Sequence, residues 1–232
     1  MRKAVFTCIV AMLVAASAAA ADITPTEARW LKGAWPVIAF AGQARLPLDI
    51  VVLPQSPPGA VPLALAFVEG RCKLVLSMRG NPEAQATLER IAPDLVDATI
   101  ELMTAHELGH CWRYAKGAWY DVPVGFVPAV PLELEGELRS AYVGMTAQRR
   151  EEGFGDLVGL AWVRQRRPAD YERLYAWLAA ERTHERVRGS PHDTLVWVHL
   201  AEKGVAVVDG SIFKGAAALW VRGLSADADA NE

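Results

Sequence analysis

Two histidines four residues apart, with a glutamate beside the first, are the residues of this chain best suited to metal chemistry. The stretch TAHELGHCW contains His106, Glu107 and His110. On an α-helix the two imidazoles share one face, so both can bind a single zinc ion. Glu107 lies beside that face, where it can accept a proton from a metal-bound water. The same five-residue pattern also arises by chance on buried helices, so the spacing alone leaves a purely structural role open.

A hydrolytic zinc site needs a third protein ligand and one open position. Metzincins take that ligand from the same stretch of chain, in a longer pattern with a glycine and a third histidine. Arg113 and Lys116 occupy those two places here, which excludes that class. A later stretch, EEGFGD, offers two carboxylates four residues apart, Glu152 and Asp156, which share one face if the stretch is helical.

HELGH followed by this E-x-x-x-D pattern resembles the gluzincin zinc metallopeptidases, over about residues 100–160. The resemblance implies an active enzyme with one zinc ion per chain. It also implies that Glu152 is the third ligand and that Asp156 orients the ring of His106. A carboxylate on the far ring nitrogen sets the tautomer of a ligating histidine and raises its basicity.

Glu151 competes with Glu152 for the role of third ligand. We favour Glu152 because Asp156 lies one turn after it, whereas Gly155 lies one turn after Glu151. A solvated acidic face that follows two arginines is the other interpretation of this pair.

His192, in SPHDT, is the candidate catalytic residue outside these two motifs. Several gluzincin families place a histidine after the third ligand to stabilise the oxyanion of the tetrahedral intermediate. A surface-loop histidine is an equally good interpretation. Tyr120 and Tyr142 are alternative oxyanion donors. We expect His184 to be solvated and His199 to be a packing residue.

The first 21 residues have the layout of a secretory signal peptide. Arg2 and Lys3 precede a short apolar run, and small residues favour cleavage after Ala20 or Ala21. The apolar run is short for a membrane span, which needs roughly 20 residues, although an uncleaved anchor is the alternative. We therefore expect a periplasmic or secreted protein of the exported bacterial type, without stable membrane insertion after cleavage.

The charge balance of the mature chain gives no indication of a nucleic-acid partner. Cleavage leaves 22 basic and 27 acidic residues, so the net charge is about −5. The expected partner is a peptide or protein substrate.

Two cysteines, Cys72 and Cys111, remain after cleavage, and a pair in an exported protein predicts a disulfide. Two separate buried thiols are the alternative. Cys111 lies about 100° around the helix from His110, so it points away from the metal. The pair would then join a strand to the metal-binding helix.

The rest of the chain predicts a small sheet followed by helices. A helix capped by Thr26 should end or bend at Pro36, and Glu69-Gly70 should form a turn between two strands. Strands are expected within 46–54, 61–69 and 72–79, and helices from 81, over 94–116, 146–167, 170–187 and 193–204, with an irregular region over 117–144.

These elements predict an α+β domain over 22–224, and the resemblance to gluzincins implies a zincin-like fold. Its first part, 22–117, holds the sheet packed on the HExxH helix, and its second part, 118–224, is mainly helical. Residues 225–232 should form a disordered acidic tail. The strand over 72–79 is expected to bind the substrate backbone, and the apolar stretch over 118–131 to supply pocket walls.

The expected function is hydrolysis of peptide bonds by a zinc-activated water, with Glu107 as general base. A non-catalytic periplasmic zinc-binding protein and a structural envelope protein are the alternatives.

Overall fold

The computed structural model describes residues 22–127, 130–184 and 187–229, so the predicted signal peptide lies outside the described residues. Within these ranges the chain has seven α-helices, one short 3-10 helix and a three-stranded mixed sheet. The α+β class expected from the sequence is confirmed. None of the described helices is long and apolar enough to cross a bilayer.

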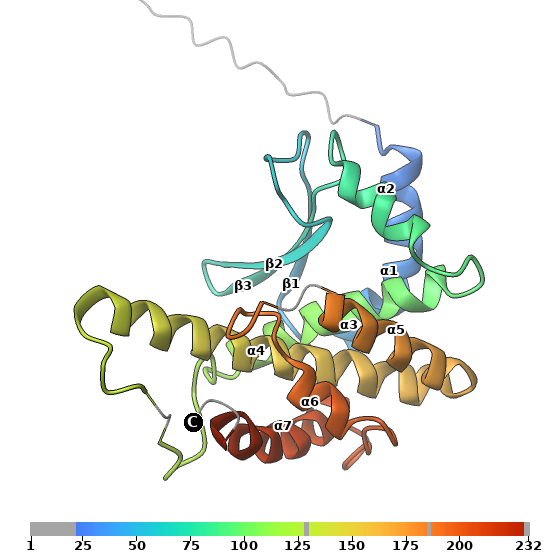
Figure 1. Cartoon of the computed structure of the whole chain (residues 1–232). Helices are drawn as coiled ribbons and strands as arrows, with labels where there is room; N and C mark the ends of the chain where they lie inside the picture. The colour runs from blue at the N-terminus through green and yellow to red at the C-terminus, as the bar shows by residue number, and fades with distance from the viewer. Residues whose placement is uncertain (1–21, 128–129, 185–186, 230–232) are drawn as a thin grey trace, which may run out of the picture.

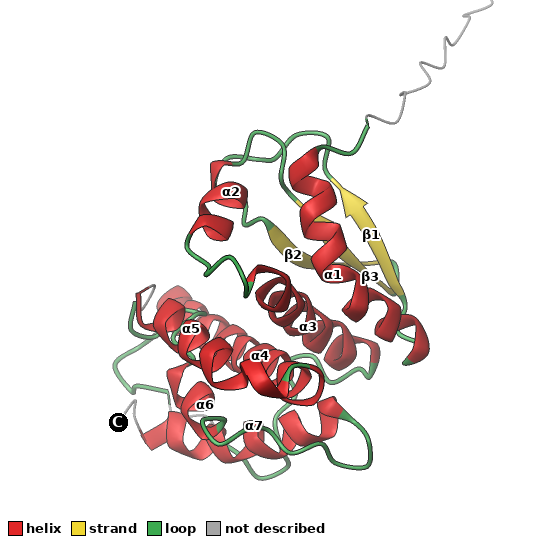
Figure 2. Ribbon diagram, turned by 90° about the vertical axis from the view of Figure 1, so that its right-hand side faces the viewer, coloured by secondary structure: helices red, strands yellow, loops and turns green. Residues whose placement is uncertain are grey.

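Helix α3 lies between the sheet and the later helices (Figures 1 and 2). The sheet, α1 and α2 lie on one side of it, and α4 to α7 lie on the other. The helices are α1 (Pro25–Gln43), α2 (Pro82–Glu89), α3 (Val96–Ala115), α4 (Gly136–Arg166), α5 (Tyr171–His184), α6 (Leu195–Leu200) and α7 (Ile212–Asp229), with the 3-10 helix at Pro168–Asp170 before α5. The strands are β1 (Leu48–Val52), β2 (Leu63–Val68) and β3 (Arg71–Leu76).

All three predicted strands form, and β3 is the central one. It pairs in parallel with β1 and antiparallel with β2. The β2–β3 turn is the predicted Glu69-Gly70, and both residues have positive φ, 51° and 76°. The expectation that the strand over 72–79 binds substrate is wrong, because both edges of β3 are already paired. β1 and β2 are the two edge strands, and β2 is the one whose residues line the cleft described below.

Close backbone contact between α3 and α4 holds the two halves of the fold together. A Cβ on Gly159 would lie 2.9 Å from the carbonyl oxygen of Leu102, and one on Gly109 would lie 3.1 Å from Val158. Because these glycines have no side chains, the backbones of α3 and α4 can lie close together. Side chains on one helix can then contact those on the other. This explains the glycine in the interior of HELGH, where it otherwise costs about 1 kcal/mol of helix stability.

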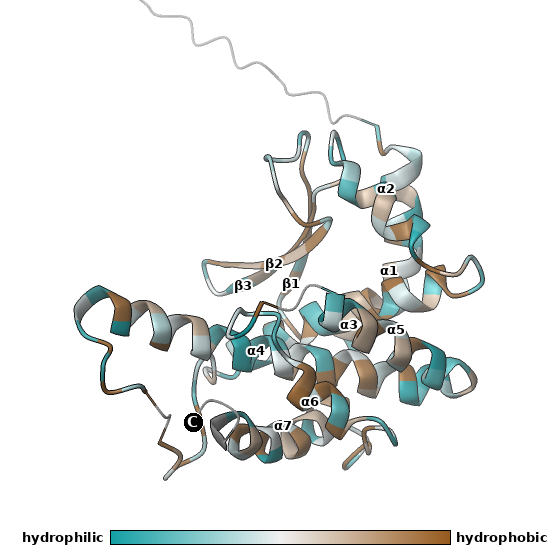
Figure 3. Ribbon diagram, viewed as in Figure 1, coloured by the Kyte–Doolittle hydropathy of each residue, from teal (hydrophilic) through white to brown (hydrophobic). Residues whose placement is uncertain are grey.

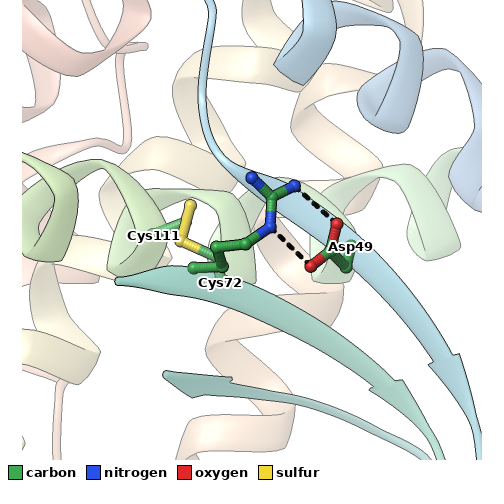
Figure 4. The surroundings of a disulfide bond; sticks show 4 residues. Asp49, Cys72 and Cys111 are labelled. Carbon is green, nitrogen blue, oxygen red and sulfur yellow. Dashed lines mark hydrogen bonds and ion pairs between the residues drawn. A yellow bond between two sulfur atoms is a disulfide. The ribbon is translucent and has the colours of Figure 1, made fainter. Parts of the chain in front are cut away.

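Apolar packing and one disulfide fix α3 on both sides. One core cluster joins α3 to α4, α6 and α7, and the mostly apolar α6 is visible in Figure 3. A second cluster joins α3 to α1, α2 and the sheet. The predicted disulfide between Cys72 of β3 and Cys111 of α3 is present, beside the ion pair of Arg71 with Asp49 (Figure 4).

Helix α1 differs from its prediction at both ends. Its N-cap is Thr24, not Thr26, and Thr24 and Glu27 form a capping box. The helix continues through Pro36 to Gln43. A proline inside a helix costs about 3 kcal/mol. Burial of one face against α3 and the sheet, which includes Trp30 and Val37, offsets that cost.

Two further boundaries were predicted wrongly. Helix α4 begins at Gly136, so the irregular region is shorter than expected. The acidic tail is helical over 225–229, because α7 extends to Asp229. Asp227 is buried and forms an ion pair with Arg149 at 2.8 Å, which gives this acidic segment a structural partner.

Candidate metal centre

Helices α3 and α4 bring three metal-binding side chains to one place. The Nε2 atoms of His106 and His110 are 3.0 Å apart. A carboxylate oxygen of Glu152 lies 3.1 Å from Nε2 of His106, and the other lies 3.6 Å from Nε2 of His110. Ligands about 2.05 Å from a tetrahedral zinc ion are about 3.3 Å from each other. The observed separations lie on both sides of that value, so the three residues fit a zinc ion.

Asp156 lies behind His106 and anchors its ring. Its Oδ1 is 2.9 Å from Nδ1 of His106. Arg182 of α5 donates two hydrogen bonds to the same carboxylate, at 2.6 and 2.9 Å, and the hydroxyl of Thr194 donates a third. Sequence reasoning did not find Arg182 or Thr194 as parts of the site. Arg182 carries no local pattern, and Thr194 stands near the start of the helix predicted over 193–204 without any feature that marks it as part of a site.

The electrostatics of the centre favour a cation. Burial lowers the pKa of His106, but hydrogen bonds to Asp156 and Glu152 outweigh it and raise the pKa to about 10. Burial raises the pKa of Asp156, but Arg182 and His106 hold it below its usual range. The pKa of Glu152 is likewise well below its ordinary value, because its hydrogen bonds to both histidines outweigh burial. Two ionised carboxylates therefore converge on the imidazoles.

A glycine on α4 makes room for the ring of His106. A Cβ on Gly155 would lie 2.8 Å from two ring atoms of His106. That distance is shorter than real Cβ atoms show, so any side chain at this position would displace the ring. Nothing in the sequence around Gly155 indicates this close contact with a residue 49 positions earlier.

Glu151 faces away from the histidines. Its carboxylate accepts two hydrogen bonds from Arg113, at 2.6 and 2.9 Å, and one from the backbone N–H of Tyr120 at 2.9 Å. Both charged side chains are buried. The structure therefore brings Glu152, not Glu151, to the histidine pair.

No model of a known protein family, no characterised protein and no solved structure matches this chain. What the structure adds to the resemblance is geometric. Residues far apart in the sequence, His106, His110 and Glu152, come together, and Asp156 lies behind the first histidine.

The centre opens on a cleft of about 510 Å³. Glu107 lines this cleft, and among the described residues none forms a hydrogen bond with its carboxylate. Burial raises its pKa, although the two histidines oppose the shift. The residues of β2 from Leu63 to Phe67 line the same cleft.

The other histidines and tyrosines named from the sequence differ in whether they line the cleft. His192 and Tyr120 line the cleft, and Nε2 of His192 lies 3.9 Å from a carboxylate oxygen of Glu152. Tyr142 does not line it. His184 is exposed, as expected, but His199 is also exposed, so its prediction as a packing residue is wrong. It lies on the solvent side of α6, while Trp197 and Val198 of the same helix are buried.

Proposed function

We propose that this protein is a zinc-dependent peptidase of the gluzincin type. The convergence of His106, His110 and Glu152 beside the carboxylate of Glu107 is the observation that carries the proposal. Two imidazoles and one carboxylate are a common donor set for catalytic zinc. Three protein ligands leave the fourth position open for water or substrate.

A zinc ion held by these residues would polarise the carbonyl of the scissile bond and acidify the attacking water. Glu107 removes the proton of that water and later delivers it to the leaving amine. Burial raises the pKa of Glu107, which strengthens it as a proton acceptor. Its carboxylate is available for this role, because the described residues leave it without a hydrogen-bond donor.

His192 and Tyr120 are the candidates to stabilise the oxyanion, because both line the cleft. An extended substrate would pair with the edge of β2. We assign the protein to the periplasm or the extracellular space. The disulfide supports this assignment, because such bonds persist in oxidising compartments.

Metal analysis and peptide hydrolysis together test the proposal. Full-length protein purified without an affinity tag should contain about one zinc ion per chain. Glu107→Gln should retain the zinc and lose hydrolysis of a mixed peptide substrate. His110→Ala should lose the zinc, whereas His199→Ala, which changes an exposed histidine outside the cleft, should retain both properties.

Each alternative function has its own outcome. Zinc without hydrolysis of any peptide would indicate a non-catalytic zinc-binding protein. Absence of zinc from the wild type, including after incubation with zinc and dialysis, would indicate a structural envelope protein and overturn the proposal.

A further inference from the structure

Four aromatic side chains form one wall of the cleft, and we call this group the aromatic wall. Its members are Phe67, Tyr114, Trp119 and Tyr120. Phe67 of β2 stacks on Tyr114 of α3, and the ring of Trp119 lies between those of Tyr114 and Tyr120, at 5.8 and 5.2 Å. The aromatic wall is therefore continuous from the edge strand to the segment after α3.

The aromatic wall reaches the metal centre. The ring of Trp119 meets the ring of His110 edge to face, with 5.6 Å between centroids. Cleft residues on α3 extend from Leu102 to Tyr114, about 18 Å at the helical rise. Because His106 and His110 lie between these ends, a bound peptide has room on both sides of the metal, and the aromatic wall occupies one of those sides.

The rings of the aromatic wall are open to the cleft. Tyr114 is 37% exposed and Tyr120 is 50% exposed. Outside the metal centre, Arg90 at the C-terminal end of α2 and Glu181 of α5 are charged side chains that line the cleft, and they form an ion pair with each other at 3.8 Å. The aromatic wall itself carries no charged side chain.

A buried ion pair holds the backbone that presents Trp119 and Tyr120. Tyr120 has a φ of 65°, a conformation unfavourable for a residue with a side chain. Its N–H donates to Glu151, which Arg113 holds with two hydrogen bonds. Arg113 also donates to the carbonyl oxygen of Asp121 at 2.7 Å. Unusual backbone conformations persist where surrounding contacts determine them, and they cluster at functional sites.

We propose that the aromatic wall is the specificity subsite of this peptidase, and that it takes a large apolar, preferentially aromatic, side chain next to the scissile bond. The inference rests on the proposed function. Aromatic rings bind other rings in edge-to-face or offset contacts, which the exposed faces here provide. A carboxylate side chain would lose its hydration against these rings without gaining a partner. Glu151 and Arg113 are positioning residues, because they act through the backbone of Tyr120 and Asp121.

The cleavage preference of the full-length, zinc-loaded protein tests the subsite. A defined peptide mixture is digested and the sites are read by mass spectrometry. In Trp119→Ala, kcat/KM at sites flanked by Phe, Tyr or Leu should fall at least about tenfold, because lost contacts in an apolar pocket have effects of that size. Sites flanked by Ala should change by less than about threefold. Trp35→Ala is the matched control, because Trp35 is 61% exposed on α1 and does not line the cleft.

Tyr120→Gly provides a second variant that preserves the fold, because glycine adopts positive φ without strain. Because Tyr120 is also a candidate oxyanion donor, the measure is the ratio of kcat/KM at aromatic sites to kcat/KM at Ala sites, which Tyr120→Gly should lower as Trp119→Ala does. Glu151→Gln should raise KM for aromatic sites more than it lowers kcat, and should leave the zinc content unchanged.

Binding is measured separately by calorimetry, with the best-cleaved peptide as ligand and Glu107→Gln as the inactive background. Adding Trp119→Ala to that background should weaken binding at least about tenfold.

The outcomes separate this inference from the proposed function. Wild-type cleavage with an unchanged preference in both Trp119→Ala and Tyr120→Gly overturns the aromatic subsite and leaves the peptidase standing. Without any wild-type cleavage the peptidase fails. In that case, Phe-containing peptides that bind in a Trp119-dependent manner would support the aromatic wall as a peptide-binding site, and absence of such binding would overturn both.

Discussion

Asp156 Oδ1 lies 2.9 Å from Nδ1 of His106, while Nε2 of the same ring faces Glu152 and His110. An ionised carboxylate at Nδ1 requires the proton on that nitrogen. A metal ion would displace the proton of Nε2 and bind the lone pair that faces Glu152 and His110, while Asp156 keeps the proton on Nδ1. The four-residue spacing from Glu152 to Asp156 therefore couples the third candidate ligand to the orientation of the first histidine.

Asp156→Asn should weaken zinc binding by about 10- to 100-fold, because an amide neither fixes the tautomer nor raises the basicity of His106 as a carboxylate does. Competition with a chromogenic chelator measures the dissociation constant. Asp209→Asn, an exposed aspartate outside the cleft, is the control and should bind zinc as the wild type does. Equal affinity of the two variants would show that Asp156 does not support the metal centre.

Gly155→Ala should destabilise the fold and weaken zinc binding, because the added methyl group would lie 2.8 Å from the ring of His106. Overpacking of this kind costs about 1–3 kcal/mol. Gly144→Ala is a matched change on the same helix, with no atom within 4 Å of the new Cβ. It should stabilise the protein by up to about 1 kcal/mol through helix propensity. Urea unfolding of both variants checks the opposite signs, and equal effects would contradict the close contact at Gly155.

The sequence was sufficient for the parts of the site that depend on helical spacing. The histidine pair of HELGH and the pair of Glu152 and Asp156 each share a face because their members are one turn apart. Glu152 was preferred to Glu151 as the third ligand because the carboxylate of Asp156 lies one turn after it. Strands β1 to β3 were also found, because apolar runs bounded by proline or glycine are strong local signals.

The rest depends on contacts between distant residues. Arg182 meets Asp156 from 26 positions away, and Thr194 from 38, without any periodic pattern that marks them. The edge strand was misassigned because strand order is a tertiary property, which the sequence of β3 does not express. The acidic end of α7 looked disordered, because nothing near Asp227 in sequence indicates that Arg149 is its partner.

Loss of the disulfide should lower the free energy of unfolding by about 4 kcal/mol, as chain entropy predicts for a loop of 39 residues. Because Cys111 directly follows His110, the bond also ties the candidate metal centre to β3. The double variant Cys72→Ala, Cys111→Ala is compared with the wild type by urea unfolding, with and without reductant. Reductant should destabilise only the wild type. An equal loss of stability in both proteins would show that the reductant acts on something other than the Cys72–Cys111 bond, and would contradict the prediction.

The ion pair between Glu27 and Arg79 should make stability depend on pH. Arg79 donates two hydrogen bonds to the buried carboxylate of Glu27, at 2.7 and 3.0 Å, and joins α1 to the segment after β3. These bonds, together with those from Thr24, lower the pKa of Glu27 from 4.5 to about 2, although burial opposes the shift. The folded pKa lies below the unfolded one, so the stabilisation is present above pH 4.5 and is lost as pH falls toward 2.

Glu27→Gln should therefore reduce the free energy of unfolding by up to about 3 kcal/mol at pH 7, the equivalent of the pKa difference. The gap between wild type and variant should narrow as pH falls from 4.5 toward 3, because the wild-type carboxylate loses its advantage as the unfolded chain takes up a proton. Urea unfolding at pH 7, 4.5 and 3 measures the gap. Glu83→Gln removes a carboxylate that is 59% exposed and 3.7 Å from Arg90, and it should change stability by less than about 0.5 kcal/mol at every pH. A gap for Glu27→Gln that stays constant across this range would show that its cost comes from lost packing and not from the ionised pair.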